Sequence, residues 1–484
     1  VDNLKGKPKI SIVMPVYNPD PKWLAQTIES VQNQIYSNWE LCIADDASSD
    51  AEVHKVIERF RSIDERIKVV YRDVNGHISN ASNSALEMAS GQWVALLDHD
   101  DVLAEHALAL VVEAINESPG ACLIYSDEDK LNKSGVRTDP YFKPDFDPLL
   151  LCGQNMICHL AVFRHDLIKD VGGFRIGFEG AQDYDLVLRV VEKLGVGQVI
   201  HIPHVLYHWR MHSRSTAASL DAKDYSYNAG LKALQEHLDR TNAGAEAQAT
   251  QFSYYRVRYP LPDIKPEVSI IIPTRNGYKL TRQCIESIQK KSTYQNYEII
   301  VVDNGSDDPK ILKYFESIQS DPSVRVIRDD RPFNYSMLNN SAVAQARGDY
   351  VCLMNNDIEV ISPEWLGEMM GLAVRPGIGI VGACLWYPNN TLQHGGVVLG
   401  IGGVAGHSQK HMRRKTEGYF GRGVVTQSYS AVTAACCVVK KSIYQEVGGL
   451  NEADLQVAFN DVDFCLKVRQ AGYRNVWTPF AELY

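Results

Sequence analysis

The sequence contains no run of about 18 consecutive apolar residues, which excludes a membrane-spanning helix within it. Basic residues are also scarce: 49 Lys and Arg stand against 59 Asp and Glu, and the net charge of −10 argues against a nucleic-acid-binding protein. No secretory signal is visible, and none of the ten cysteines forms a C-x-x-C pair. We therefore expect a cytoplasmic protein with reduced, mostly buried thiols and no zinc ribbon.

What the sequence does contain is a duplication. Three segments of the first half recur in the second half in the same order: 10–18 as 268–276, 40–48 as 298–306, and 183–185 as 461–463. A repeat of about 260 residues is too long for a solenoid unit. The chain therefore consists of two copies of one whole domain.

Each copy alternates short apolar runs with amphipathic ones. In the first copy we expect strands at 10–15, 39–44, 67–71 and 93–97, and helices at 22–34, 52–62 and 79–89. This alternation is typical of an α/β fold with a mostly parallel sheet covered on both faces. A helix expected at 223–240 and a Pro-punctuated stretch after it predict a first domain at 1–216, a helical linker at 217–265 and a second domain at 266–484.

Ligands of such sheets bind beyond the carboxyl ends of the strands, so the residues there are the candidates. Polar or aromatic residues follow the first two strands of each copy: Pro15, Tyr17, Asn18, Asp45 and Asp46 in the first, and Pro273, Arg275, Asp303 and Asn304 in the second. Such side chains can hold a nucleotide base or a ribose hydroxyl. They can equally form a turn and cap the next helix.

After the fourth strand, Asp98-His99-Asp100-Asp101 places three carboxylates within four residues. Their mutual repulsion favours a bound divalent cation, for which Mg²⁺ and Mn²⁺ suit oxygen ligands, over a solvated turn. The second copy keeps fewer charges there, in Asn355-Asn356-Asp357.

Asp183 and Asp461 each begin a predicted helix, where the helix dipole stabilises the anion and keeps it able to act as a base; helix capping is the alternative. Two further segments carry candidates for acceptor contacts. Asp127-Glu128-Asp129 follows the predicted strand 122–126, either as an acceptor contact or as a solvated turn, and His394-Gly395-Gly396 opens a glycine-rich insertion expected to be a mobile loop near the acceptor side.

In this order, the motifs resemble the inverting family 2 glycosyltransferases of the GT-A fold, present twice in tandem. The resemblance rests on 11–18, 40–48, 98–101, 172–174, 182–185 and 207–215 in the first copy, and on 268–276, 298–308, 348–359, 433–450 and 459–465 in the second. It covers nearly the whole chain and implies two GT-A domains, Rossmann-like with a mostly parallel sheet.

The resemblance implies that Tyr17 and Asp46 contact the nucleotide base, and that Asp100 with Asp98 or Asp101 holds Mn²⁺ or Mg²⁺ against the donor diphosphate. It implies that Asp183 is the catalytic base, and that His212, with His208 as the fallback, is the late metal- or diphosphate-binding histidine. The full expectation is nucleotide contacts from Pro15, Tyr17, Asn18, Asp45, Asp46, Asp98, Pro273, Arg275, Asp303, Asn304 and Asn355, metal ligands among Asp98, Asp100, Asp101, His208, His212 and Asp357, and bases Asp183 and Asp461.

These assignments predict a bifunctional, metal-dependent, inverting glycosyltransferase. It would move sugars from a UDP- or dTDP-linked donor to an oligosaccharide or lipid-linked glycan, and so extend a bacterial surface polysaccharide such as O-antigen. Asn304 and Asn355 make the second copy similar to bacterial rhamnosyltransferases, which favours dTDP-rhamnose or a comparable donor. A lipid-linked acceptor would place the protein on the inner face of the cytoplasmic membrane.

Two alternatives remain open. The second copy has fewer acidic residues and stops at Tyr484, where family members usually continue with histidines, so it is expected to be truncated. Only the first domain would then be catalytic, with the second an acceptor-binding or scaffolding module. A nucleotidyltransferase also holds metal on carboxylates, but it would lack the late Asp-x-Asp helix start.

Overall fold

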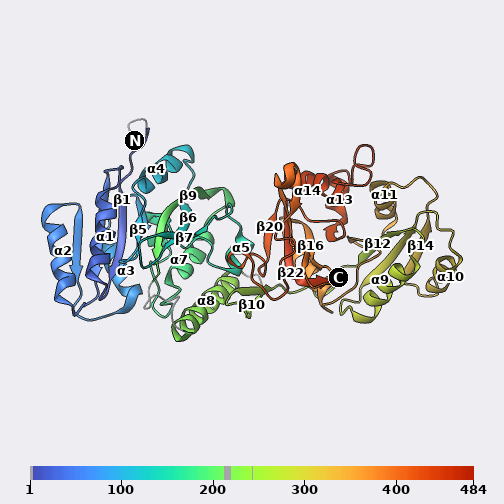
Figure 1. The fold of residues 1–484 in the computed structure, drawn as a ribbon, viewed down its shortest axis with the longest axis horizontal. Coiled ribbons are helices and arrows are strands. Elements are labelled where there is room, and N and C mark those ends of the chain that lie inside the picture. The colour runs from blue at the N-terminus through green and yellow to red at the C-terminus, as the bar shows by residue number, and fades with distance from the viewer. Residues whose placement is uncertain (1–3, 212–219, 242–243) are drawn as a thin grey trace. The chain divides into compact units, whose positions relative to one another are not determined.

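The structure is a computed structural model that describes residues 4–211, 220–241 and 244–484. The chain forms two compact units, residues 1–243 and 244–484, coloured from blue to green and from green to red in Figure 1. We call them the first and the second unit.

The first unit begins with the expected alternation of strands and helices. These elements are β1 (Ile10–Val16), α1 (Pro21–Gln32), β2 (Trp39–Asp45), α2 (Ala51–Ile63), β3 (Ile67–Tyr71), α3 (His77–Glu87) and β4 (Trp93–Leu96). Local chemistry sets the helix starts: Asp20 and Asp50 each accept a hydrogen bond from a backbone N–H of the first turn of α1 and α2. The strands are nearly continuous apolar runs because helices cover the sheet.

The second half of the first unit completes the same sheet. Its elements are β5 (Val102–Leu103), α4 (Ala107–Glu117), β6 (Leu123–Leu131), β7 (Arg137–Tyr141), α5 (Pro148–Gly153), β8 (Ala161–Arg164), α6 (His165–Asp170), α7 (Gln182–Val191), the 3-10 turn Val196–Gln198, β9 (Val199–Arg210) and α8 (Leu220–Arg240). The strand order is β3-β2-β1-β4-β8-β6-β9-β5, with β7 beside β6. Strands β3, β2, β1 and β4 run parallel, whereas β8 is antiparallel to both of its neighbours.

The second unit repeats this order. Its elements are β10 (Glu246–Ala249), β11 (Tyr255–Arg258), β12 (Val268–Thr274), α9 (Tyr278–Lys291), β13 (Tyr297–Asp303), α10 (Pro309–Ile318), β14 (Val324–Arg328), α11 (Tyr335–Gln345), β15 (Tyr350–Met354), α12 (Trp365–Ala373), β16 (Ile378–Trp386), β17 (Leu392–His394), β18 (Val397–Leu399), β19 (Ala405–His407), β20 (Gln427–Tyr429), β21 (Cys436–Lys440), α13 (Lys441–Glu446), α14 (Asn460–Gln470) and β22 (Arg474–Leu483), with 3-10 turns at Ile401–Gly403 and Tyr419–Gly421. The order β14-β13-β12-β15-β21-β16-β22-β20 matches the first sheet in its first seven strands; the eighth differs, because β20 comes just before β21 in the chain, whereas β5 comes directly after β4.

A buried glutamate ties the sheet together in each unit. Glu40 accepts a hydrogen bond from the Ser11 hydroxyl at 2.6 Å, and Glu298 accepts one from the Ser269 hydroxyl at the same distance. Both glutamates are buried and paired with surface cations, Lys9 and Lys68 on Glu40 and Arg325 and Arg347 on Glu298. The repeat is therefore preserved in buried polar chemistry as well as in topology.

The segment expected as a linker is divided between the two units. Helix α8 packs on α7, and Glu192 of the loop after α7 accepts hydrogen bonds from His237 and Arg240 of α8. The β10–β11 hairpin belongs to the second unit. None of the ten cysteines, all of which lie in the described part of the chain, forms a disulfide, and nine are buried, as expected. Among the helices that the structure describes, none is both long enough and apolar enough to cross a bilayer.

Candidate active site

The carboxyl ends of β1, β2 and β4 meet at one edge of the first sheet. Val16 at the end of β1 pairs with Asp45 at the end of β2, and the N–H of Leu97 donates to the carbonyl of Val13 in β1 at 3.1 Å. The chain turns directly after β4, where the N–H of Asp101 donates to the carbonyl of Asp98 at 3.3 Å. The predicted residues after these strands thus share one edge.

Two of the acidic candidates at this edge are already engaged within the protein. The carboxylate of buried Asp46 accepts hydrogen bonds from Arg72 Nε at 2.7 Å and from the N–H of Gly76 at 2.9 Å. Asp45 accepts one from His54 Nε2 at 3.0 Å. Both aspartates therefore hold the loops that follow β2 and β3, and any contact with a ligand would add to this role.

The candidates at the end of β1 differ in their surroundings: two contact other loops, and one is exposed. Asn18 accepts a hydrogen bond from the N–H of Ser49 at 2.9 Å and so joins the loops after β1 and β2. The carbonyl of Pro15 lies 3.2 Å from Nδ1 of His99. Tyr17 is 50% exposed, which leaves its ring free to stack on a planar ligand.

A three-residue group of metal-ligand type lies at the end of β4. One ligand atom each from Asp98, Asp101 and His159 lies within 4.8 Å of the others. The turn after β4 brings its first and last residues, Asp98 and Asp101, together. Asp100, which was expected to be a ligand, is outside this group.

The electrostatics of Asp101 fit a bound cation. Its buried carboxylate accepts hydrogen bonds from the Tyr207 hydroxyl at 2.6 Å and the N–H of Arg210 at 2.7 Å. Burial, together with the neighbouring Asp100 and Asp98, raises the pKa of Asp101 well above its usual range. A divalent cation offsets such crowding, and two carboxylates with an imidazole are ligands that Mn²⁺ accepts.

His159 reaches the group because β8 runs antiparallel to β4, with Val162 beside Ala95. The residues just before β8 therefore lie next to those just after β4. His159 Nε2 is 3.8 Å from Asp98 Oδ2, and the ring stacks on Tyr207 with centroids 4.4 Å apart. His159 was not among the candidates predicted from the sequence, since a single histidine before a short apolar strand carries no signal without the strand order.

A buried lysine and glutamate hold the segment that carries His159. Lys143 Nζ donates to Glu128 Oε2 at 3.0 Å and to the carbonyls of Ile157 at 2.9 Å and His159 at 2.5 Å. Burial opposes the charge of Glu128, but Lys143 and His159 lower its pKa to about 2. Glu128 lies within β6, so the expectation of a solvated turn at Asp127–Asp129 is wrong: this strand continues to Leu131.

The charges around His159 favour a protonated ring. Burial opposes a charge on its ring, but Cys158, Asp98 and Glu128 raise the pKa of His159 well above its usual value. His159 Nδ1 lies 3.5 Å from Glu128 Oε2, so the ring stands between two carboxylates. Binding of a metal ion at Asp98 would have to displace this proton.

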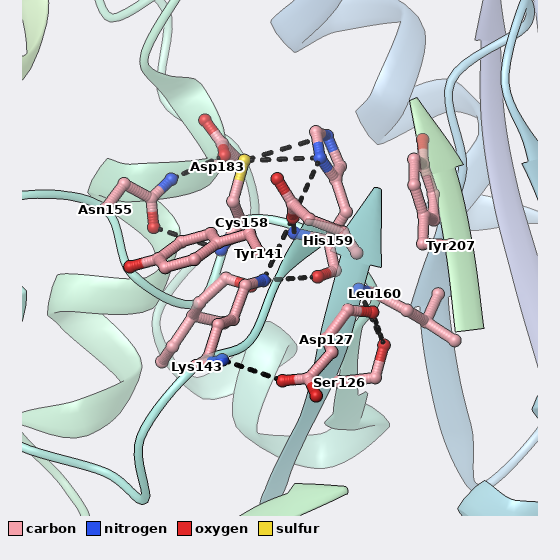
Figure 2. A network of polar contacts seen from close by, with 12 residues as sticks. Ser126, Asp127, Tyr141, Lys143, Asn155, Cys158, His159, Leu160, Asp183 and Tyr207 are labelled. Atoms are coloured by element: carbon pink, nitrogen blue, oxygen red, sulfur yellow. Dashed lines mark hydrogen bonds and ion pairs between the residues drawn. The ribbon is translucent and has the colours of Figure 1, made fainter. Parts of the chain in front are cut away.

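Asp183 lies in the first turn of α7, close to this group. Asn155 Nδ2 donates to Asp183 Oδ2 at 2.7 Å, and Figure 2 shows both residues on the side of Cys158 and His159 away from Tyr207. Burial raises the pKa of Asp183, the charge of His159 opposes that shift, and Asp98 adds to it. The predicted base therefore lies within electrostatic reach of Asp98 and His159.

Of the two histidines expected near the metal, His208 lies elsewhere. Side chains alternate along β9, so His208 points to the face opposite Tyr207, and its Nδ1 lies 2.6 Å from Asp129 Oδ1. It is not part of the Asp98 group. His212 lies outside the described residues.

In the second unit, Asp303 at the end of β13 and Asn304 directly after it hold loops as Asp45 and Asp46 do in the first unit, but with different partners. Asp303 accepts a hydrogen bond from Arg328 Nη1 at 2.6 Å. Asn304 Nδ2 donates to the carbonyls of Asp329 at 3.0 Å and Arg331 at 2.8 Å, and its buried Oδ1 has no partner. Asn304 is thus a donor at the position where Asp46 is an acceptor.

The other candidates of the second unit lie at the same strand edge. Pro273, within β12, is half-buried, and Arg275, directly after β12, is exposed. The N–H of Asn355 donates to the carbonyl of Ala435 at 2.9 Å. Asp357 is exposed. Asp461, in the first turn of α14, accepts a hydrogen bond from the N–H of Ala434 at 3.3 Å. Among the described residues, no group of three metal ligands occurs in this unit.

Comparison with known proteins identifies the family. Residues 11–172 and 269–448 match the model of glycosyl transferase family 2, one segment in each unit. The chain belongs to glycosyl transferase family 2. The expected class, two tandem GT-A α/β domains, is confirmed, with the antiparallel strands β8 and β21 in otherwise largely parallel sheets.

This family 2 chain has relatives that match it from end to end. It is 54% identical to the uncharacterized protein y4gI of Sinorhizobium fredii and 36% identical to the O-antigen biosynthesis protein RfbC of Myxococcus xanthus, each over 100% of the chain. The chain spans only 54% and 38% of the lengths of these two proteins. Among solved structures, Staphylococcus aureus TarS 1–349 is 19% identical over 49% of this chain and 74% of its own, with a TM-score of 0.37.

Proposed function

We propose that the chain is a bifunctional, metal-dependent, inverting glycosyltransferase that uses nucleotide-diphosphate sugars to extend a bacterial surface polysaccharide. The observation that carries this proposal is the placement of a metal-ligand group, Asp98, Asp101 and His159, within electrostatic reach of Asp183 at the carboxyl edge of a family 2 sheet. The similarity to the O-antigen biosynthesis protein RfbC of Myxococcus xanthus supports a polysaccharide product.

In the first unit, Asp98, Asp101 and His159 would hold Mn²⁺ or Mg²⁺. Such an ion, when bound, neutralises the charge of a leaving diphosphate. Asp183 takes the proton of the acceptor hydroxyl, whose oxygen forms a bond to the anomeric carbon of the donor sugar. The bond from that carbon to the diphosphate breaks on the opposite face, and the nucleoside diphosphate leaves with the electron pair. One displacement of this kind inverts the anomeric configuration.

The other residues of the first site prepare Asp183 for this role. Burial raises its pKa and makes it a stronger base, while the hydrogen bond from Asn155 keeps Oδ2 in place. The exposed ring of Tyr17 is available to a nucleotide base. A UDP- or dTDP-linked sugar as donor and an oligosaccharide or lipid-linked glycan as acceptor are part of this proposal, as is a location on the inner face of the cytoplasmic membrane for a lipid-linked acceptor.

The test combines a donor screen with product analysis. UDP-, dTDP- and GDP-sugars are tested for thermal stabilisation of the full chain in the presence of Mn²⁺, because a donor that binds the native state raises its apparent stability. The stabilising donor is then incubated with oligosaccharide acceptors, with and without EDTA. We expect two linkages of inverted configuration whose formation EDTA abolishes; full turnover in EDTA would refute metal dependence.

A second candidate function follows from the second unit. Asp357 is exposed, and among the described residues no three-ligand group lies there, which favours a second unit that binds the acceptor without catalysing transfer. Asp461→Asn distinguishes the two functions. Loss of one linkage with retention of the other supports two active sites, whereas retention of every linkage supports a binding module.

A further inference from the structure

The second unit contains a pair of histidines that has no counterpart among the described residues of the first unit. His394 ends β17 and His407 ends β19, both within the long connection between β16 and β21. Their Nδ1 atoms are 2.9 Å apart, and the rings meet edge to face with centroids at 5.1 Å. His394 is fully buried and His407 is half-buried.

The protons of this pair can be assigned from the hydrogen bonds. The N–H of Thr433 donates to Nε2 of His394 at 3.3 Å, so that nitrogen carries no proton. Burial and the neighbouring His407 lower the pKa of His394 well below its usual value, so its ring is neutral and holds its proton on Nδ1. His394 therefore donates to Nδ1 of His407. A neutral His407 then carries its own proton on Nε2.

The pair lies beside Asp461. Thr433 and Ala434 are adjacent, and while the first donates its N–H to His394, the second donates its N–H to Asp461 Oδ2 at 3.3 Å. Burial and Lys410 lower the pKa of His407, whereas the charge of Asp461 acts in the opposite direction. One short backbone segment thus fixes both the histidine pair and the proposed base of the second unit.

The register of the two sheets shows what the pair replaces. Arg164 of β8 lies opposite Trp93, and Lys440 of β21 lies opposite Tyr350, the equivalent of Trp93. Counting back along both strands, Ala435 takes the position of His159. The second unit therefore lacks the histidine that lies next to Asp183 in the first unit, and the insertion supplies one from another direction.

The glycines after His394 are required by this packing. A Cβ on Gly396, whose φ is +91°, would lie 2.3 Å from the ring of Tyr429. The N–H of Val397 donates to the carbonyl of Ala431 at 2.9 Å, and the return bond measures 3.2 Å. The insertion is thereby joined to the segment that bears Thr433, and the part of it expected to be a loop forms strands.

We propose that the second unit uses the His394–His407 pair to bind the acceptor hydroxyl, with His407 Nε2–H donating to the oxygen that Asp461 deprotonates. This N–H would orient the hydroxyl proton toward Asp461 and stabilise the negative charge that develops on the oxygen. His394 acts as a positioning residue, because its buried Nδ1–H fixes the ring and the tautomer of His407. This inference rests on the proposed function of the second unit.

The experiment compares two amides in place of His407 in the full chain. Asparagine keeps an amide near the position of Nδ1 but has no donor at the position of Nε2, whereas glutamine can place an N–H there. We expect His407→Asn to lower kcat for the linkage that depends on Asp461 by about 100-fold, with little change in the KM of the donor, and His407→Gln to restore most of it. His411→Gln, an exposed histidine of the same insertion, is the control.

Two measurements separate the inference from the function on which it depends. Asp461→Asn is assayed first. If it leaves every linkage intact, the proposal that the second unit catalyses a reaction is wrong, and this inference is wrong with it. If Asp461→Asn abolishes a linkage and His407→Asn does not slow it, or if His407→Gln is as slow as His407→Asn, only the inference fails. Long-range ¹H–¹⁵N correlations of labelled histidines provide a readout without activity, with the proton expected on Nδ1 of His394 and Nε2 of His407. The opposite tautomers would overturn the proposal.

Discussion

Asp98 and His159 come from the ends of two antiparallel neighbours, β4 and β8, and their Oδ2 and Nε2 atoms lie 3.8 Å apart. Sixty residues of chain separate them in the sequence. These include two helices, three strands and the buried Lys143–Glu128 pair that holds the loop before β8. Because His159 lies beside the turn after β4, the carboxylates of that turn and the imidazole form a group that can bind a divalent cation.

Metal binding should depend on His159 and not on His208. We expect Asp98→Asn and His159→Gln each to weaken Mn²⁺ binding by about 10- to 100-fold, because each removes one of three converging ligand atoms. His208→Gln should leave the affinity unchanged, since that ring contacts Asp129. Calorimetric titration of Mn²⁺ into the full chain measures all three. A large loss in His208→Gln with none in His159→Gln would restore the assignment that the family resemblance implies.

Asp183→Asn should remove the first linkage. The amide cannot accept the hydroxyl proton, so we expect kcat for that linkage to fall by about 10²- to 10⁴-fold while the linkage that depends on Asp461 is retained. Asp166→Asn, which changes an exposed carboxylate, serves as the control. The products are separated and their linkages assigned by NMR. Unchanged turnover in Asp183→Asn would exclude this residue as the base.

Asn155→Ala should shift the pH dependence of the same reaction. Burial raises the pKa of Asp183, and the hydrogen bond from Asn155 partly offsets that shift by stabilising the anion. Without it the pKa rises further, so the acid limb of kcat/KM for the first linkage should move to higher pH while the plateau changes less. An acid limb that stays in place, or that moves to lower pH, would contradict this account.

Glu40→Gln should destabilise the first unit in a pH-dependent manner. Burial opposes the charge of Glu40, but Lys68, Lys9, Ser11 and the N–H of Ser90 hold its pKa well below 4.5. A carboxyl whose pKa is depressed on folding contributes stability above its unfolded pKa and loses that contribution on acidification. We expect a loss of about 3 kcal/mol at pH 7 and a flatter decline below about pH 4.5.

Urea unfolding at a series of pH values measures the effect of Glu40→Gln. Glu52→Gln is the matched control because its carboxylate is exposed and pairs with Lys55, which is exposed as well. Parallel stability curves for the wild type and Glu40→Gln below pH 5 would show that Glu40 is not responsible for acid sensitivity.

The Asp46 and Asn304 positions should not be interchangeable. Asp46 faces donors, Arg72 and the N–H of Gly76, whereas Asn304 faces the carbonyls of Asp329 and Arg331. Asn304→Asp would set a buried carboxylate against two acceptors, and Asp46→Asn would leave Arg72 without its counter-ion. We expect each to cost about 1–3 kcal/mol, measured by thermal unfolding, with exposed Asp330→Asn as the control. If Asn304→Asp does not change the stability, the carbonyls of Asp329 and Arg331 must turn away from the new carboxylate.

The sequence by itself determined the duplication, the alternating elements and the strand ends. Short apolar runs such as 10–15 and 39–44 can be buried only under helices, and the parallel order follows from the helical crossovers. The candidates at the ends of β1, β2 and β4 could also be predicted from the sequence, because each lies next to the end of its strand in the chain.

The tertiary structure alone decided which of these candidates meet. Whether Asp100 or Asp101 joins Asp98 depends on the turn after β4, and whether His159 or His208 joins them depends on which strand lies antiparallel to β4. Likewise, His394 and His407 meet only because the insertion folds back on Thr433. Contacts of this kind join residues far apart in the chain. The local sequence does not determine the strand order or the hydrogen bonds that a loop makes across the sheet, so these contacts could not be predicted from it.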